Sequence, residues 1–157
     1  YDEGDGVPRD KSKAIQLYQQ AAQMSDAHAM YNLALCYQNG DGVSQDTSKA
    51  IQLYQQASDL GHSDAMVNLG VCYKNGDGVP QDDAKAIQLY QQAADLGNAN
   101  AVFNLSFCYR NGDGVPRDKS KAFQLFQQSA RMHNPHAITA VKKCDDESQN
   151  DTWILKN

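Results

Sequence analysis

The sequence has no long apolar run and no excess of positive charge. No stretch of about 18 apolar residues occurs in its 157 residues, and no charged-then-apolar leader opens it, so neither a membrane span nor a signal peptide is visible. The 14 Lys and Arg are outnumbered by 19 Asp and Glu, giving a net charge of -5. Because nucleic-acid binding requires a broad positive field, we expect neither DNA nor RNA as a partner.

Cysteines are few, and their spacing does not suit a disulfide or a zinc site. Packed helices lie about 8 to 10 Å apart between axes, whereas a disulfide needs Cα atoms within about 7 Å. Zinc needs several ligands converging on one point. We therefore expect buried, reduced thiols, no metal, no cofactor and, because thiols stay reduced there, a cytoplasmic protein. The four stand 36 residues apart, at Cys36, Cys72, Cys108 and Cys144.

Signatures of catalysis are also missing. The Asn-Gly-Asp-Gly loops do not match an EF-hand, because Tyr37 and Ser48 stand where the acidic first residue and the final Glu would be. No Gly-rich phosphate loop follows a strand, because no strand is predicted. We therefore expect that the protein is not an enzyme. The histidines, which have no regular Ser, Cys or carboxylate companion, are His28, His62, His133 and His136.

The dominant feature is an internal repeat of 36 residues. Residues 37–72 and 73–108 are identical at 24 of 36 positions, which indicates duplication. A period of this length predicts stacked supersecondary units rather than an ordinary globular fold. The motif Gly-Asp-Gly-Val begins at Gly4, Gly40, Gly76 and Gly112.

Each unit is predicted to contain two amphipathic helices, A and then B. Apolar residues at helical spacing form a core stripe on helix A, and Asn39-Gly40-Asp41-Gly42 then ends that helix. Asp46 is the predicted N-cap of helix B, matched by Asp10, Asp82 and Asp118. Turns are expected at 39–45, 75–81 and 111–117. The core residues expected are Ala29, Leu33, Cys36 and Tyr37 on helix A, and Ala50, Leu53, Tyr54, Ala57 and Leu60 on helix B, which Gly61 or Gly97 ends.

The predicted fold is an all-α, right-handed α-solenoid (superhelix) of stacked antiparallel helix pairs with a concave surface lined by the A helices. Residues 1–144 hold about four units. The N-terminal unit is expected to be truncated, because Tyr1 aligns with Tyr37 at the end of a helix A. Residues 145–157 are expected to be an acidic, flexible tail, in which Trp153-Ile154-Leu155 docks on an apolar surface.

The repeat closely resembles the Sel-one-like repeat, a relative of the tetratricopeptide repeat, in its length and in its Gly-x-Gly loop. The resemblance implies an adaptor role in protein-protein interaction. One branch of that family bridges paired cysteines within a unit, but this sequence has one cysteine per unit, so that pattern does not carry over. The resemblance rests on Ala29, Asn32, Leu33, Tyr37, Gly40, Gly42, Val43, Asp46, Lys49, Ala50 and Tyr54 and their counterparts.

The face of helix A that points away from the core stripe should be exposed to solvent, yet its middle is apolar in every full unit. An exposed apolar strip on a soluble protein marks a binding site, although tight curvature could instead bury it between adjacent A helices. The strip consists of Tyr31, Leu35, Val67, Val71, Phe103 and Phe107.

Polar residues accompany the strip. Asn32, Asn68 and Asn104 form a ladder whose amides could pair with the backbone of an extended partner, or could instead tie helix A to the backbone of its neighbour. Lys74 and Arg110 lie at the margin and favour an acidic partner, whereas Ala34, Gly70 and Ser106 favour close helix packing.

The sequence therefore predicts a non-catalytic interaction scaffold or adaptor that binds a peptide or protein segment in its concave groove. The alternative is a structural module that self-associates end to end, through its truncated N-terminal end or its C-terminal tail.

Overall fold

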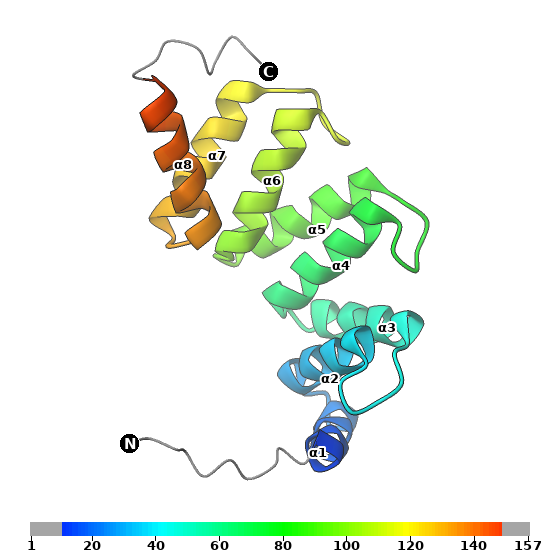
Figure 1. The fold of residues 1–157 in the computed structure, drawn as a ribbon. Coiled ribbons are helices and arrows are strands. Elements are labelled where there is room, and N and C mark those ends of the chain that lie inside the picture. The colour runs from blue at the N-terminus through cyan, green and yellow to red at the C-terminus, as the bar shows by residue number, and fades with distance from the viewer. Residues whose placement is uncertain (1–10, 149–157) are drawn as a thin grey trace, which may run out of the picture. The chain divides into compact units, whose positions relative to one another are not determined.

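The structure is a computed structural model, and it describes residues 11–148 (Figure 1). That range contains eight helices and no strand, so the predicted all-α class is confirmed. The helices of type B have odd numbers and those of type A have even numbers. They are α1 (Lys11–Gln23), α2 (Ala27–Asn39), α3 (Thr47–Asp59), α4 (Ser63–Asn75), α5 (Asp83–Asp95), α6 (Ala99–Asn111), α7 (Lys119–Arg131) and α8 (Pro135–Ser148).

The chain divides between Gln81 and Asp82 into two compact parts. In the N-terminal part, α2 packs against both α1 and α3, and α3 packs against α4. In the C-terminal part, α6 packs against α5 and α7, and α7 packs against α8. Each part therefore consists of consecutive helices that bury their apolar faces against the next helix in the chain, as a repeat array requires.

The helix ends follow the predicted chemistry. Asp46 is the N-cap of α3, and its carboxylate accepts a hydrogen bond from the Lys49 backbone N–H at 3.0 Å. Asp82 and Asp118 cap α5 and α7 in the same way, while Asp10 lies outside the described residues. Gly76 ends α4 in the left-handed conformation, at φ 77°, and its N–H donates to the Cys72 carbonyl.

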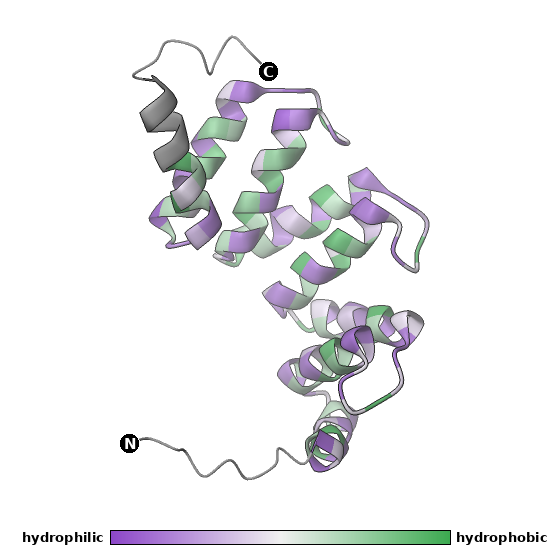
Figure 2. Cartoon of the chain, in the orientation of Figure 1, coloured by the Kyte–Doolittle hydropathy of each residue, from purple (hydrophilic) through white to green (hydrophobic). Residues whose placement is uncertain are grey.

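Most of the predicted core is buried between helices, and Figure 2 shows both apolar and polar residues on each of the helices α1 to α7. The prediction was wrong for Leu60, which is 50% exposed. Helix α3 ends at Asp59 and Leu60 is its C-cap, so the helical spacing that placed Leu60 inward no longer applies there. Buried as predicted are Ala29, Leu33, Ala50, Tyr54 and Ala57, with the small residues Ala34, Gly70 and Ser106; Leu53 and Tyr37 are half-buried.

The cysteines follow the core prediction in part. Cys72 and Cys108 are buried, whereas Cys36 is half-buried. No disulfide joins these three described cysteines. Burial raises the pKa of both Cys36 and Cys72, and the nearby carboxylates Asp41 and Asp77 raise these two values further, so both thiols are neutral at pH 7.

The C-terminal helix is longer than the sequence indicated. We expected it to end at Cys144, but α8 continues to Ser148. Residues 149–157, with the predicted docking segment Trp153-Ile154-Leu155, lie outside the described residues, as do residues 1–10, which include Tyr1. Between residues 11 and 148, every helix is too short or too polar to cross a membrane.

Candidate functional site

In each of the two parts, the candidate site is the side of the even-numbered helices that carries the predicted apolar strip, here called the A-helix face of that part. In the N-terminal part it includes Tyr31 and Leu35 of α2, which are half-buried, and Val71 of α4, which is 36% exposed. Val67 is only 7% exposed, so at this position the strip is buried, as the alternative to an open binding surface required. Adjacent helices therefore cover one member of the strip and leave others partly accessible.

Tyr31 is held by an aromatic contact with the following helix. Its ring stacks on the imidazole of His62 with 4.6 Å between centroids and 21° between planes, and it lies 6.0 Å from the ring of Tyr54. Burial raises the pKa of Tyr31, the Asp64 carboxylate raises it further, and a hydrogen bond with Asn68 lowers it. The phenol is therefore neutral at physiological pH and can both donate and accept hydrogen bonds.

Asn68 belongs to a hydrogen-bond chain that joins three helices. Its side-chain Nδ2 donates to the hydroxyl of Tyr54 at 3.2 Å, and that hydroxyl donates to Oε1 of Gln38 at 2.5 Å. Tyr54 is completely buried, and burial raises its pKa to about 12. Asn68 therefore has a side-chain partner on α3, rather than the backbone of a neighbouring helix that the structural interpretation of the asparagine ladder expected. Asn32 and Asn104 are half-buried at the equivalent positions.

In the C-terminal part the strip is an aromatic cluster. Phe103 and Phe107 of α6 meet edge to face at 4.9 Å, and both contact Phe126 of α7, at 5.7 and 5.2 Å. Phe126 is a core residue, 5% exposed. The two α6 rings are half-buried and rest on the core rather than standing free of it. The guanidinium of Arg110 lies over the Phe107 ring at 4.3 Å, a cation–π contact that fixes a positive charge beside the cluster.

Sequence reasoning missed a histidine pair that joins the starts of α2 and α4. His62 is the N-cap of α4, and its Nδ1 accepts a hydrogen bond from the Ala65 backbone N–H at 3.3 Å. Its Nε2 lies 3.0 Å from Nδ1 of His28. The equivalent residues of the C-terminal part are asparagines, since Asn134 caps α8 and donates to Asn100 at 2.7 Å. The available signal was the position of His62 immediately before α4, where an N-cap is expected.

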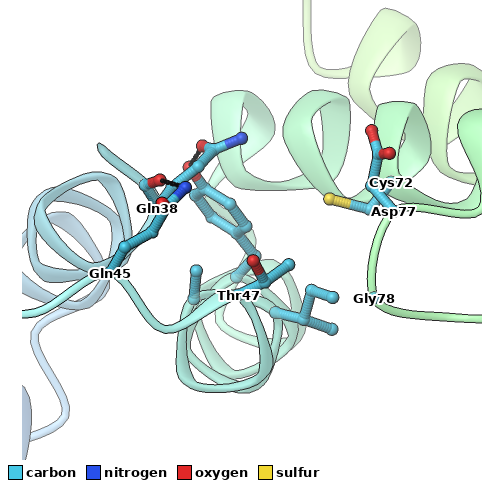
Figure 3. A pocket seen from close by; sticks show the side chains of 9 residues that line it. Gln38, Gln45, Thr47, Cys72, Asp77 and Gly78 are labelled. Atoms are coloured by element: carbon cyan, nitrogen blue, oxygen red, sulfur yellow. Dashed lines mark hydrogen bonds between the residues drawn. The ribbon is translucent and has the colours of Figure 1, made fainter. Parts of the chain in front are cut away.

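Sequence reasoning also missed a pocket in the N-terminal part (Figure 3). Its volume is about 310 Å³, and it lies between the end of α2, the first two turns of α3 and the loop after α4. Gln38 and Gln45 lie on one side, Cys72 and Asp77 on the other, and Thr47 lies between them. Ala50, Ile51, Tyr54 and Gly78 complete the lining. The Nε2 of Gln45 donates to the backbone carbonyl of Gln38 at 2.9 Å, which holds that side of the pocket in place.

Among residues 11–141, whose side chains the structure describes, no three His, Cys, Asp or Glu side chains gather in an arrangement that could hold a metal ion. The chemistry of the face is instead that of a contact surface, with aromatic and aliphatic side chains beside amides and an arginine.

The family model of the Sel1 repeat matches residues 1–26, 27–62, 63–98 and 99–134 in turn. The chain belongs to the Sel1-repeat family. The matched boundaries place one helix pair in each complete repeat, starting with helix A. Sel1-repeat proteins are generally non-catalytic protein-interaction scaffolds. A comparison with curated protein sequences finds no match.

Solved structures of Sel1-repeat proteins resemble this chain. A Sel1 repeat protein from Oxalobacter formigenes is 36% identical with a TM-score of 0.81, covering 87% of this chain and 56% of its own. The protective antigen c5321 of uropathogenic Escherichia coli, described as displaying an SLR fold, is 34% identical with a TM-score of 0.78, covering 82% and 27%. Cysteine rich protein B of Helicobacter pylori is 26% identical with a TM-score of 0.65, covering 87% and 98%. The chain thus spans about half, or less, of the first two relatives.

Proposed function

We propose that this Sel1-repeat chain is an interaction scaffold whose A-helix face binds an extended or helical segment of a partner protein. The observation that carries the proposal is the incomplete burial of the apolar strip. Tyr31 and Leu35 in the N-terminal part, and Phe103 and Phe107 in the C-terminal part, are half-buried, and Val71 is exposed. Apolar side chains that neighbouring helices leave partly uncovered gain free energy when a partner covers them, about 25 cal/mol for each Å² of apolar surface.

The rigidity of the strip supports the proposal. Tyr31 is stacked on His62, and Phe107 is held between Phe126 and Arg110. Aromatic side chains that are already ordered lose little conformational entropy when they bind, which is why they serve as anchors at interfaces. The strip therefore offers a preorganised surface in each part.

The polar groups beside the strip define the partner's chemistry. The amides of Asn32 and Asn104 supply donors and acceptors for a partner's peptide groups, whereas Asn68 positions Tyr31 and Tyr54. The guanidinium of Arg110 beside Phe107 favours an acidic residue of the partner at that point. An acidic partner should associate more slowly as salt rises, because ions screen charges over about 8 to 10 Å.

A displayed library of random 16-residue peptides provides a probe that does not require the partner to be identified. A selected peptide is added to the isotopically labelled chain, and backbone amide shifts are followed. We expect the largest shifts in α2, α4 and α6, near Tyr31, Val71 and Phe107. Shifts confined to exposed apolar residues outside the strip, near Leu17, Leu60 and Leu96, would contradict the proposal.

A further inference from the structure

The pocket of the N-terminal part lies at a position that occurs once in every repeat, and two successive copies differ in one informative way. In the preceding copy, Asp41 of the loop after α2 faces Lys11 at the start of α1. Nζ of Lys11 lies 3.1 Å from Oδ1 of Asp41, an ion pair on the surface. In the next copy, Asp77 occupies the position of Asp41 and Thr47 that of Lys11, 36 residues later.

The backbone is arranged alike in both copies. A Cβ atom added to Gly42 would lie 2.7 Å from Cδ1 of Ile15, and one added to Gly78 would lie 2.7 Å from Cδ1 of Ile51. Each loop therefore runs equally close to the preceding helix of type B. The difference lies in the side chains. Thr47 is short and uncharged, so it places no ammonium group beside Asp77, and a pocket of about 310 Å³ lies there instead.

The lining of the pocket suits the shape and charge of a lysine side chain. Ile51, Ala50 and the buried ring of Tyr54 provide apolar walls for an aliphatic stem. Asp77 carries the one formal charge among the nine lining residues, because the Cys72 thiol is neutral. Oε1 of Gln38 already accepts from Tyr54 and has a second lone pair to offer an ammonium group.

We propose that this pocket binds a lysine side chain of a partner protein, placing its ammonium group beside Asp77 as Lys11 is placed beside Asp41. The inference rests on the proposed function for the source of the lysine. The volume agrees with it, since sites for small ligands begin at about 300 Å³. The chain's own Lys11 shows which side chain this position of the repeat accommodates.

The test uses two small probes, N-acetyl-lysine methylamide and N-acetyl-norleucine methylamide, which share a four-carbon stem and differ in the ammonium group. Amide shifts of the full chain are followed by NMR as each probe is added. We expect saturable shifts at Gln45, Thr47 and Gly78 with the lysine probe and at least about tenfold weaker binding of the norleucine probe. Equal shifts with both probes, or no saturable shift, would overturn the inference.

Three variants assign the effect to the pocket. Asp77→Asn removes its charge, and Thr47→Lys supplies the pocket with a lysine from the chain itself; each should weaken binding of the lysine probe at least about tenfold. Thr47 is exposed at the first position of α3, where α1 carries Lys11, so the substitution is compatible with the fold. Asp41→Asn is the matched control and should leave binding unchanged, because Lys11 already occupies that copy. If the Asp77→Asn variant binds the lysine probe as well as the wild type does, the probe does not bind in this pocket and the inference is wrong.

The outcome separates this inference from the proposed function. If the lysine probe fails while library-selected peptides still perturb α2, α4 and α6, the pocket inference falls and the A-helix face stands. If the probe binds while no peptide perturbs that face, the proposed function falls and the pocket remains a site for a lysine.

Discussion

Nε2 of His62 lies 3.0 Å from Nδ1 of His28, and the N-cap hydrogen bond of α4 fixes which atom carries the proton. Because Nδ1 of His62 accepts from the Ala65 N–H, that nitrogen is unprotonated and the proton resides on Nε2. Nε2 then donates to His28, whose Nδ1 must also be unprotonated. Both interactions form together only when both imidazoles are neutral.

This relationship predicts that stability falls on mild acidification. Burial lowers the pKa of His62 and the neighbouring His28 lowers it further, while Asp64 and Asp26 raise it; the stacked Tyr31 is neutral. As the pH drops through about 6.5, the unfolded chain takes up a proton that folded His62 resists, so the free energy of unfolding decreases. The loss ends below the lowered pKa of the folded state. Urea unfolding between pH 7.5 and pH 5, at about half-unit steps, measures it.

The matched variant carries His28→Asn together with His62→Asn. It reproduces the Asn100–Asn134 pair of the C-terminal part, in which Asn134 caps its helix and bonds its neighbour without titrating. The variant should lose less stability than the wild type over this pH interval. Parallel pH profiles for the two proteins would show that the histidine pair has no part in the acid sensitivity.

Substitutions at two glycines of the N-terminal part distinguish the cost of a left-handed backbone from the cost of steric contact with neighbouring side chains. Gly61 and Gly78 have φ values of 85° and 71°, but an added Cβ meets nothing within 4 Å at Gly61 and lies 2.7 Å from Thr47 and Ile51 at Gly78. Gly61→Ala should cost about 1 to 2 kcal/mol of stability from the left-handed backbone alone. Gly78→Ala should cost more. Denaturant unfolding of the two variants gives the comparison, and equal losses would exclude a contribution from close packing of the loop.

The hydrogen-bond chain through Tyr54 should couple α4 to α3. We expect Tyr54→Phe and Asn68→Ala each to destabilise the chain by about 1 kcal/mol, because each leaves a polar group without its partner. In the double variant the losses should not add, with a coupling energy of about 0.5 to 1.5 kcal/mol measured by a double-mutant cycle. Simple additivity would mean that the 3.2 Å contact contributes nothing to stability.

Thiol reactivity should follow burial. Cys36 is half-buried whereas Cys72 and Cys108 are buried, so a thiol reagent should modify Cys36 before the other two in the folded protein. Denaturation without reductant should then expose four thiols in total. Recovery of two or none would show that disulfides form, and would also remove the basis for expecting a reducing compartment.

The sequence predicted those features that depend on local rules and on the repeat. Asp46 begins a helix and Gly76 ends one because caps act within a single turn, and the period of 36 residues repeats these signals. It also placed Tyr54 and Leu33 in the core, since helical spacing determines which residues share a face.

Features that depend on contacts between helices were less accessible. Val67 belongs to the outward side of α4 by spacing, yet the packed helices bury it. His28 and His62 are 34 residues apart, and their pairing depends on how two helix starts are brought together. The pocket depends on the loop after α4 packing against the start of α3, which brings Asp77 and Thr47 into one lining, and helical spacing alone does not reveal that contact. The equivalent residues of the preceding copy, Asp41 and Lys11, form an ion pair.

The central claim, that the A-helix face binds partner segments, is tested most directly by measuring binding and melting on the same samples. The probe is a library-selected peptide, and the variants are Val71→Ala and Leu60→Ala, which truncate exposed apolar residues on and off that face. We expect Val71→Ala to weaken binding by about 1 kcal/mol, or roughly fivefold, with little change in melting temperature, and Leu60→Ala to leave binding unchanged. Full binding by Val71→Ala together with weakened binding by Leu60→Ala would contradict the claim.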